Sequence, residues 1–535
     1  MKTVCVVGGG VAGVAVTKEL LGLGIAVDCF EMMPRVGGVF ASHVWNGGQL
    51  TSSSIFTWFS DFPVTNRQTF FTWEEMLDYL DRYVEHFKVK EKIQLNCKIV
   101  SARREEGRWR VQVHRKNWSN GHPYHPNPNI VEEAIFERFY DHLVVCSGLH
   151  NEQSIPEVPG LDSFSGQILH SSTYRDAEVF RNKRVVVVGS GESASDIALQ
   201  IAPVAYTCTI SIRSAPGTLV PRWIQGNTPD IRDDRLTYNL PHILAPLILW
   251  GHRAFYYEQK ERPELFRWAA DSNYKNKRCP FNTNACKSFG IPEAIIDHKA
   301  ELYGEIQRAD KNTLYFADNI SREVDAVIFC TGFIRRFAFL HPTLSAQLIG
   351  IKHLWKNVVH PDLGDSIFLV GFTRPQQINL VSIAEMQSRL VGQLLSGRML
   401  PSAAQMREDI EADQAWMHRY YGVRYEKNPA LVDYLYYMDG MAKFIGCSIP
   451  RFKSMLDPHL WFKLHFASLN GAHYRLAGPG ADWKAAAATI KATPLFSNKR
   501  KAIRRWVLLS FLTIFSAFMG IFQKKWRLVS DQARP

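Results

Sequence analysis

A glycine-rich turn between a short apolar strand and a helix constrains the fold of this chain more than any other feature. The run Val4–Val7 has the apolar character of a buried parallel strand. It leads into three glycines, Gly8, Gly10 and Gly13, spaced as G-x-G-x-x-G. Such glycines allow a tight turn, the approach of a pyrophosphate and close packing of the following helix. Glu31 ends the next strand, where a carboxylate accepts hydrogen bonds from a ribose diol.

Strand, turn, helix and acid together predict a dinucleotide-binding unit rather than an ordinary glycine-rich turn of an α/β protein. Gly37 and Gly38 follow Glu31 closely, and this second glycine pair favours FAD over NAD. The residues of this stretch that we expect to contact FAD are Gly8, Gly9, Gly10, Val11, Ala12, Gly13, Glu31, Gly38, Val39 and Phe40.

A second strand–glycine–helix unit occupies residues 183–202, with Gly189 and Gly191 as its first two glycines and Ala194 at the third position. The strand that follows ends in Arg213 instead of an acid. An arginine there pairs with a 2′-phosphate, so this unit favours NADPH over NADH, unless Arg213 is simply a surface residue. The expected NADP contacts are Gly189, Gly191, Ser193, Ala194, Ser195, Asp196 and Arg213.

Two similar segments, VVCSG at 144–148 and AVIFCTG at 326–332, predict strands at a switch between the two nucleotide-binding units. Residues 72–88 predict an amphipathic helix with Thr72 and Glu75 as its capping box. Residues 215–300 are rich in Pro, Trp and Tyr, and we expect an irregular insertion there, with an apolar helix at 242–257.

A length of 535 residues, with 46% hydrophobic and 21% charged residues, predicts a globular chain of several domains. The nine cysteines include no CxxC pair, which suggests reduced thiols in a cytosol-facing protein. His122 and His125 lie in a loop without ligand partners at suitable spacing, so we expect no metal site. The chain leads directly into a strand, and we expect no cleavable signal peptide.

The C-terminal segment Trp506–Gln523 contains 18 residues without a charge and is flanked on both sides by Lys and Arg. This length is near the lower limit for a transmembrane helix, and the flanking charges disfavour the alternative of a buried helix. The net charge of +12 has a local excess here, which indicates a membrane surface rather than nucleic acid. We therefore expect a membrane anchor at 504–526, spanning or monotopic.

Two nucleotide-binding units in one chain predict hydride transfer from a nicotinamide to a flavin. The sequence disfavours a disulfide as the next electron acceptor, because no CxxC pair exists. A quinone, another protein and molecular oxygen all stay open at this point.

The segment from Phe164 to Tyr174 matches F-x-G-x-x-x-H-x-x-x-Y, with Gly166 and His170 in place, and it precedes the second glycine motif. This pattern resembles the identifying sequence of the flavin-containing monooxygenases, class B flavoprotein monooxygenases, and the chain is similar to the animal microsomal enzymes. Further matches over nearly the whole chain are Asp61-Phe62-Pro63, Cys330-Thr331-Gly332-Phe333 and Tyr474-Arg-Leu-Ala-Gly-Pro-Gly480.

The resemblance implies an α/β fold with two Rossmann-like dinucleotide-binding domains, an FAD domain with an inserted NADPH domain, and a C-terminal anchoring helix. We expect the FAD domain in 1–160 and 331–440, the NADPH domain in 161–330, a helical and irregular region in 441–500 and the anchor in 504–526. His170 and Tyr174 are expected to help build the linker between domains rather than to act chemically.

The implied activity, similar to that of an N,N-dimethylaniline monooxygenase, is oxygenation of nucleophilic N or S atoms of small lipophilic compounds. It uses FAD, NADPH and molecular oxygen and proceeds through a C4a-hydroperoxyflavin. The resemblance also implies the endoplasmic reticulum membrane, with the catalytic domains facing the cytosol, and a homo-oligomer is compatible with it. The family's Baeyer–Villiger relatives usually carry Trp at the position of Tyr174, which disfavours oxygenation of carbonyls.

Thr51 stands where the family has an active-site asparagine that contacts flavin and NADP⁺. A hydroxyl here replaces an amide, so Thr51 and Ser52 are the candidate catalytic residues, with Ser53 as a further hydroxyl. The resemblance places Thr51 and Ser52 against FAD, and Leu50 and Thr51 against NADP. The change from asparagine keeps two alternatives open: an NADPH oxidase that releases hydrogen peroxide, and a non-catalytic nucleotide-binding protein.

Overall fold

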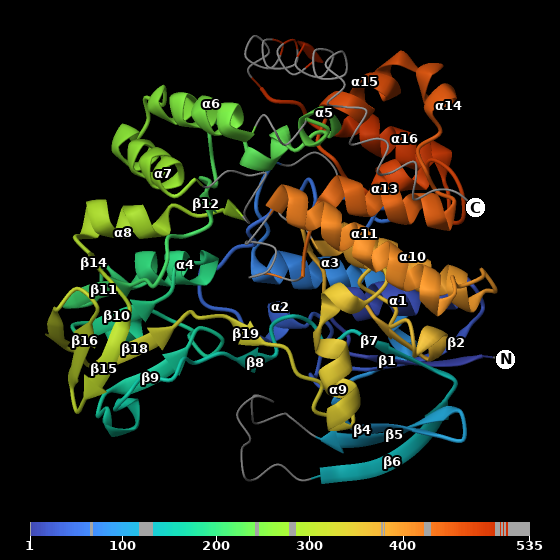
Figure 1. Ribbon diagram of the computed structural model, residues 1–535, viewed down its shortest axis with the longest axis horizontal. Helices are drawn as coiled ribbons and strands as arrows, with labels where there is room; N and C mark the ends of the chain where they lie inside the picture. The colour runs from blue at the N-terminus through green and yellow to red at the C-terminus, as the bar shows by residue number, and fades with distance from the viewer. Residues whose placement is uncertain are drawn as a thin grey trace.

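Two parallel sheets, each with helices, lie side by side in the computed structural model, and a helical C-terminal region covers the first of them (Figure 1). The structure describes residues 2–64, 68–116, 132–240, 245–277, 285–375, 378, 380–421, 428, 430–497, 503, 507 and 510–511. The predicted loop at 117–129 lies outside these residues, as does most of the predicted anchor at 504–526.

The first sheet has the strand order β20-β7-β1-β2-β3, and all its pairs are parallel. Helix α1 (Val11–Gly22) follows β1 and packs with helix α10 (Leu380–Leu395) in one hydrophobic core. Strand β20 thus brings the later part of the chain back to the first unit. The strands are β1 (Thr3–Val7), β2 (Ala26–Phe30), β3 (Ile93–Gln94), β7 (His142–Val145) and β20 (Ile367–Leu369).

The second sheet has the order β14-β11-β10-β18-β9 and is also parallel throughout. Helix α4 (Glu192–Ile201) follows β10, as the second glycine motif predicts, and packs beside helix α8 (Gly290–His298). The two-unit α/β architecture is confirmed. The strands are β9 (Gln167–His170), β10 (Arg184–Val188), β11 (Thr207–Ser211), β14 (Glu301–Tyr303) and β18 (Ala326–Phe329).

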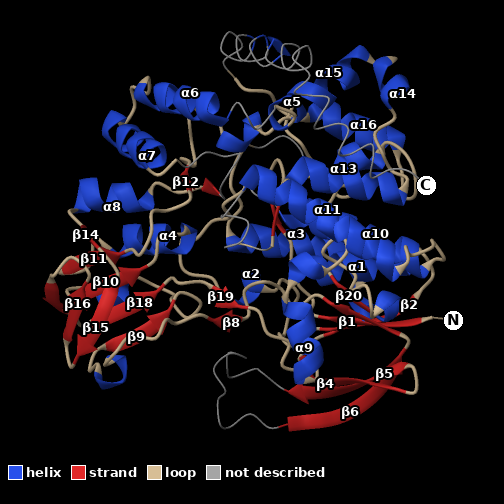
Figure 2. Cartoon of the chain, in the orientation of Figure 1, coloured by secondary structure: helices blue, strands red, loops and turns tan. Residues whose placement is uncertain are grey.

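Both chain crossings between the two sheets lie together. Strand β8 (Glu152–Gln153) leaves the first unit, β19 (Phe333–Ile334) returns to it, and the two strands pair antiparallel in the middle of Figure 2. The imidazole of His170 donates from Nε2 to the carbonyl oxygen of Gly332 at 2.9 Å, and burial lowers its pKa. The prediction of a switch built from 144–148 and 326–332 is therefore confirmed.

The remaining elements surround this frame. Helix α3 (Trp73–His86) begins at the predicted capping box of Thr72 and Glu75. An antiparallel sheet lies below the first unit in Figure 1 and consists of β4 (Cys97–Glu105), β5 (Arg108–Lys116) and β6 (Glu132–Tyr140). The other helices are α2 (Val39–Ser42), α9 (Pro342–Ile349), α11 (Ala403–Tyr421), α13 (Tyr434–Ile445), α14 (Arg451–Met455), α15 (Pro458–Phe466) and α16 (Trp483–Ala492). A small antiparallel sheet consists of β15 (Ile306–Asp310), β16 (Thr313–Phe316) and β17 (Ser321–Glu323). A further pair of short parallel strands consists of β21 (Arg374–Pro375) and β22 (Leu431–Val432).

The insertion at 215–300 is more regular than its composition predicts. It has a hydrophobic core of its own around Tyr256, Phe266 and Phe289, three aromatic side chains that are buried and contact one another. The correction has a physical cause, because these aromatics pack across helices and leave no periodic pattern within one helix. The elements are β12 (Thr218–Leu219), α5 (Arg235–Tyr238), α6 (Ala245–Tyr257), α7 (Pro263–Lys275) and β13 (Ala285–Cys286).

The structure places little of the predicted anchor. In the part of the chain that it describes, no helix has both the length and the hydropathy that crossing a bilayer requires. Of residues 504–526 only Val507, Ser510 and Phe511 are described. The eight described cysteines are free, which agrees with the prediction of thiols.

Candidate functional site

The first glycine turn has the backbone that its motif predicts. Gly8 has φ +102°, and a Cβ on Gly13 would lie 1.8 Å from the carbonyl oxygen of Gly8. Strand and helix therefore approach too closely for any side chain at Gly13. Gly38, with φ +57°, lies opposite the turn, where a Cβ would be 3.2 Å from the Cα of Gly10. These features fit a dinucleotide whose phosphates contact the start of α1.

Glu31 holds the turn through two backbone hydrogen bonds, and its contact with a ribose stays a prediction. Its Oε2 accepts from the backbone N–H of Gly9 at 2.5 Å, and its Oε1 accepts from that of Met33 at 2.8 Å. Burial raises the pKa of this carboxyl, and the two amide hydrogen bonds oppose the rise. Among the other predicted FAD contacts, Val39 and Phe40 are half-buried at helix α2 beside the turn. FAD therefore fits the residues present, while each contact stays a prediction.

The second turn is similar but offers more space. Gly189 has φ +136°, and a Cβ on Gly191 would meet no atom within 4 Å, which leaves room for a pyrophosphate. Arg213 is exposed just beyond the end of β11, so its guanidinium group is accessible to a 2′-phosphate. Ser193 is half-buried in the first turn of α4. Ala194 and Ser195 are fully buried, and Ser195 Oγ accepts from the N–H of Ile291 at 3.0 Å. Ser195 thus contacts helix α8.

The segment Leu50–Ser52 lies between the two units and is held from the insertion. Arg222 donates from Nη1 to the carbonyl oxygen of Leu50 at 2.8 Å, and its Nη2 pairs with Oδ2 of Asp196 at 2.9 Å. The predicted NADP contact Asp196 therefore has a structural partner in Arg222. Because α4 follows the second glycine turn, this ion pair connects Leu50 and Thr51 to the proposed NADPH site.

Lys287 forms a second connection one residue further along. Its Nζ donates to Ser52 Oγ at 3.3 Å, and its backbone N–H donates to Glu192 Oε1 at 3.3 Å. Lys287 is 5% exposed. Glu192 is the first residue of α4, so Lys287 also joins the segment of the candidate catalytic residues to the second glycine turn.

Residues 229–233 carry two further carboxyl groups, of which the buried Asp230 contacts the chain next to Ser52. Asp230 Oδ2 accepts from the N–H of Ser53 at 2.8 Å. Burial raises the pKa of Asp233 to about 7, against the opposing charge of Lys287. Sequence reasoning missed Arg222, Lys287, Asp230 and Asp233, because no motif marks them and their partners lie far away along the chain.

The family's identifying motif is structural here. Tyr174 is buried, stacks on Phe180 and donates to Gln200 Oε1 at 2.9 Å. His170 holds the crossing between the units, as described above. The structure brings neither side chain to Leu50–Ser52, in agreement with the linker role predicted for both.

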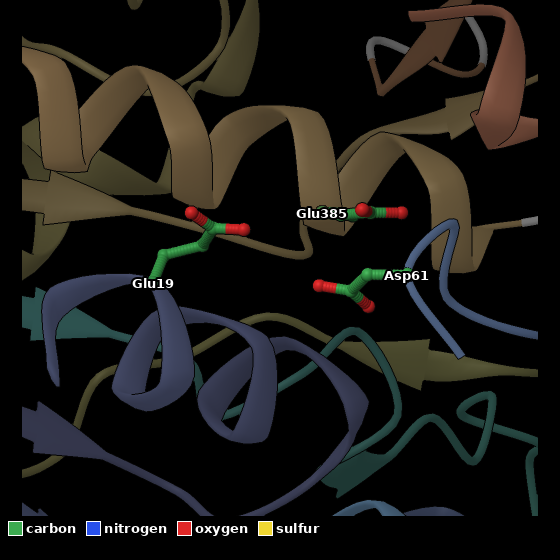
Figure 3. A group of neighbouring side chains, drawn as sticks. All are labelled: Glu19, Asp61 and Glu385. Carbon is green, nitrogen blue, oxygen red and sulfur yellow. The ribbon is translucent and has the colours of Figure 1, made fainter. Parts of the chain in front are cut away.

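A trio of carboxylates lies at the other end of α1. Among the described residues, only Glu19, Asp61 and Glu385 form a group whose oxygens, within 4.8 Å of one another, suit a metal ion. Figure 3 shows the three side chains converging from α1, α10 and the loop before α3. Arg475 Nη2 pairs with all three, at 2.9, 3.4 and 2.7 Å, and Lys18 pairs with Asp61. A cation of the chain thus already occupies the position a metal would take.

This ion cluster has opposite effects on its members. Burial alone would raise the pKa of Glu385, but the charge of Arg475 and hydrogen bonds from Ser60 lower it below its ordinary value. The pKa of Asp61 is raised by burial and by the charge of Glu385. Asp61 and Arg475 belong to two of the predicted family motifs, so these motifs fasten the C-terminal region to the first unit.

Comparisons with known proteins show the family of this chain. The family model described as flavin-binding monooxygenase-like matches residues 1–530. A 4-hydroxybenzoate brominase (decarboxylating) from Marinomonas mediterranea is 32% identical, over 96% of this chain and 98% of its own. Human flavin-containing monooxygenase 1 is 27% identical over 97% of each chain. The structure of S-allyl-L-cysteine S-oxygenase from Allium sativum superposes with a TM-score of 0.58 at 23% identity, covering 83% of this chain and 88% of its own.

Proposed function

Because this chain belongs to the flavin-binding monooxygenase-like family, we propose that it oxidises a small organic substrate with NADPH and molecular oxygen beside Leu50–Ser52. FAD and NADPH are its cofactors. The observation that carries the proposal is the connection of Leu50 and Ser52, through Arg222 and Lys287, to Asp196 and Glu192 of helix α4. This connection to the helix that follows the second glycine turn supports a site for flavin and nicotinamide beside the candidate catalytic residues.

Bound FAD would supply the redox chemistry, namely hydride acceptance from NADPH and activation of oxygen. The chain's own residues bind the cofactors and position the segment of Thr51. Gly8–Gly13 and Gly189–Gly191 receive the phosphates, and Glu31 holds the ribose. Arg222 and Lys287 bind Leu50 and Ser52 on either side of Thr51, the residue that we propose to contact the flavin. Ser53 and Ser54, which follow this segment, are buried, whereas Thr51 and Ser52 are half-buried.

The first substrate class that we propose is the soft nucleophile, an amine nitrogen or a thioether sulfur. Support comes from the match to the animal enzymes in sequence and length. The test is NADPH consumption by the FAD-loaded protein with methyl phenyl sulfide, together with the yield of sulfoxide. Consumption that rises with the thioether and gives sulfoxide supports the proposal. Consumption that yields only hydrogen peroxide supports the oxidase instead.

A second substrate class is the phenolic acid, by analogy with the brominase relative, whose name gives 4-hydroxybenzoate. The specific observation in its favour is that two charged side chains contact this part of the chain. Lys287 binds the hydroxyl of Ser52, and Asp230 binds the backbone N–H of Ser53. A pocket for lipophilic amines alone has no evident use for a buried ammonium group. The test is turnover of 4-hydroxybenzoate with NADPH, with and without bromide.

We further propose that residues 504–526 attach the enzyme to a membrane, with the endoplasmic reticulum as the location. What supports this is the uncharged run and its flanking cations. Ile503, Val507 and Phe511, which follow one another at four-residue spacing, are 54%, 64% and 63% exposed. Sedimentation with membranes that resists alkaline carbonate, and is lost when 504–526 are deleted, is the expected result. Recovery of the full chain without detergent would contradict the proposal.

A further inference from the structure

A group of buried polar side chains beside Ser52 has unused hydrogen-bonding capacity. Thr228, Asp230 and Lys287 are 0%, 2% and 5% exposed. The buried atoms Thr228 Oγ1, Asp230 Oδ1 and Asp233 Oδ2 have no hydrogen-bond partner among the described residues. Buried polar groups are almost always satisfied, so these atoms indicate a ligand or water that completes them. We call Asp230, Asp233 and Lys287 the acid–lysine cluster.

The backbone places the two carboxyl groups on one side. Residues Pro229–Arg232 form a 3₁₀ turn that ends at Asp233. Side chains three residues apart in such a turn eclipse one another, so Asp230 and Asp233 share a face. That face meets the candidate catalytic segment, because Asp230 accepts from the N–H of Ser53 at 2.8 Å.

Lys287 closes the cluster from the opposite chain segment. Its ammonium group has three N–H donors, and Ser52 Oγ is the single described acceptor. No described carboxylate forms an ion pair with it, although its charge acts on Asp233. A buried ammonium without a close anion is costly. Arg222 differs, since Asp196 already neutralises it.

Resting on the proposed function, we propose that the acid–lysine cluster recognises an organic acid that also carries a hydroxyl group. The carboxylate of the substrate accepts from Lys287, and its hydroxyl donates to an unpartnered oxygen of Asp230 or Asp233. Cation and carboxylates thus read opposite ends of one molecule. A thioether satisfies neither end, and an amine can satisfy only the aspartates.

The test is equilibrium binding to the FAD-loaded enzyme, followed by flavin absorbance, with three probes. They are 4-hydroxybenzoate, benzoate, which lacks the hydroxyl, and 4-hydroxybenzamide, which lacks the charge. We expect 4-hydroxybenzoate to bind about tenfold more tightly than either analogue, as loss of one buried polar partner predicts. Equal binding of the three probes would overturn the proposal.

Variants test which residue binds the carboxylate of the probe and which residue binds its hydroxyl. Lys287→Met should weaken 4-hydroxybenzoate by about tenfold while leaving 4-hydroxybenzamide unchanged, and Lys287→Arg should retain part of the preference for the acid. Asp233→Leu should reduce the preference for the hydroxyl, because leucine has no acceptor oxygen. The matched control is Lys463→Met, which removes another buried lysine, 8% exposed and bound to Thr493, and should change no probe. Flavin content and thermal unfolding identify any variant that has not folded, and Lys287→Arg then decides the question.

Two further readouts separate the possible failures. The affinity for NADP⁺ should be unchanged in Lys287→Met. If this variant bound NADP⁺ more weakly but 4-hydroxybenzoate equally well, Lys287 would serve a cofactor phosphate, and the proposal would be overturned. Selective binding of 4-hydroxybenzoate without any NADPH-driven turnover would contradict the proposed function but uphold the recognition site. Turnover of a thioether, together with equal binding of the three probes, would uphold the proposed function but overturn the recognition site.

Discussion

Arg222 Nη1 lies 2.8 Å from the carbonyl oxygen of Leu50, so a cation of the insertion holds the chain of the first nucleotide-binding unit. Arg222 also pairs with Asp196 on α4, in the second unit. One side chain therefore couples the two units at the segment where the candidate catalytic residues begin. The coupling connects Leu50 to helix α4, which follows the second glycine turn.

Replacement of Arg222 by Gln should lower both stability and flavin reduction. Asp196 would be left without its ion partner at a largely enclosed position, and we expect the free energy of unfolding to fall by about 2 kcal/mol. The rate of FAD reduction by NADPH should fall with it, because Leu50–Ser52 loses its fixed position. Chemical denaturation and anaerobic stopped-flow absorbance measure the two effects.

A surface ion pair provides the control. Arg253 pairs with Asp271 at 2.9 Å, but its side chain is 38% exposed. Arg253→Gln should cost less than about 1 kcal/mol and leave flavin reduction unchanged. Equal effects of the two substitutions would show that Arg222 has no special role.

Arg475→Met should be among the most destabilising single changes in this chain. It would leave Glu385 charged and buried without its cation, at an expected cost of about 3–5 kcal/mol. The matched surface change, Arg262→Met, breaks pairs with Glu264 and Asp297 at a 49% exposed arginine and should cost under about 1 kcal/mol. Urea denaturation of both variants measures the difference, and similar midpoints would refute a stabilising role for the Arg475 cluster.

The raised pKa of Asp233 predicts that the stability of the folded protein changes with pH. The folded protein retains a proton at this carboxyl up to about pH 7, whereas the unfolded chain releases it near 3.8. The stability that the group contributes is therefore fully present below about pH 4 and is lost as pH rises through about 7. In Asp233→Asn this loss should shrink by about 4 kcal/mol between the two limits. Denaturation curves at several pH values test it, and parallel pH profiles of wild type and variant would contradict it.

Thr51→Asn should lower NADPH-driven release of hydrogen peroxide. An asparagine amide offers two N–H donors besides its acceptor oxygen, whereas the threonine hydroxyl offers one O–H donor besides its acceptor oxygen. The extra hydrogen bond should protect the activated oxygen until substrate takes it. A peroxide assay in the absence of substrate makes the comparison, with Thr51→Val as the control that has no polar group. Unchanged or higher release by the asparagine variant would refute the role given to this position.

Local patterns were sufficient to predict the frame of the molecule. The two glycine turns, the capping box of Thr72 and Glu75 and the switch segments each depend on residues close together in sequence, and the structure contains all of them. Two motifs taken from the family resemblance, those of Asp61 and Arg475, meet in one ion cluster. No local pattern predicts that contact.

The charged residues around Ser52 could not be predicted in the same way. Ser52 and Lys287 are 235 positions apart, and the contact exists only after both units and the insertion have folded. Lys287 and Asp230 lie in irregular backbone or short turns, where no helix or strand period indicates which side chain points inward. Their function follows from burial and missing partners, which a sequence alone does not reveal.

Oxygen transfer from ¹⁸O₂ is the measurement that tests the central claim most directly. The FAD-loaded enzyme would be reduced anaerobically with NADPH and mixed with ¹⁸O₂ and methyl phenyl sulfide, and in a parallel sample with 4-hydroxybenzoate and bromide. The account predicts ¹⁸O-labelled sulfoxide or a modified phenol, in an amount that approaches the NADPH oxidised. Hydrogen peroxide equal to the NADPH oxidised, with neither product in either sample, would contradict it.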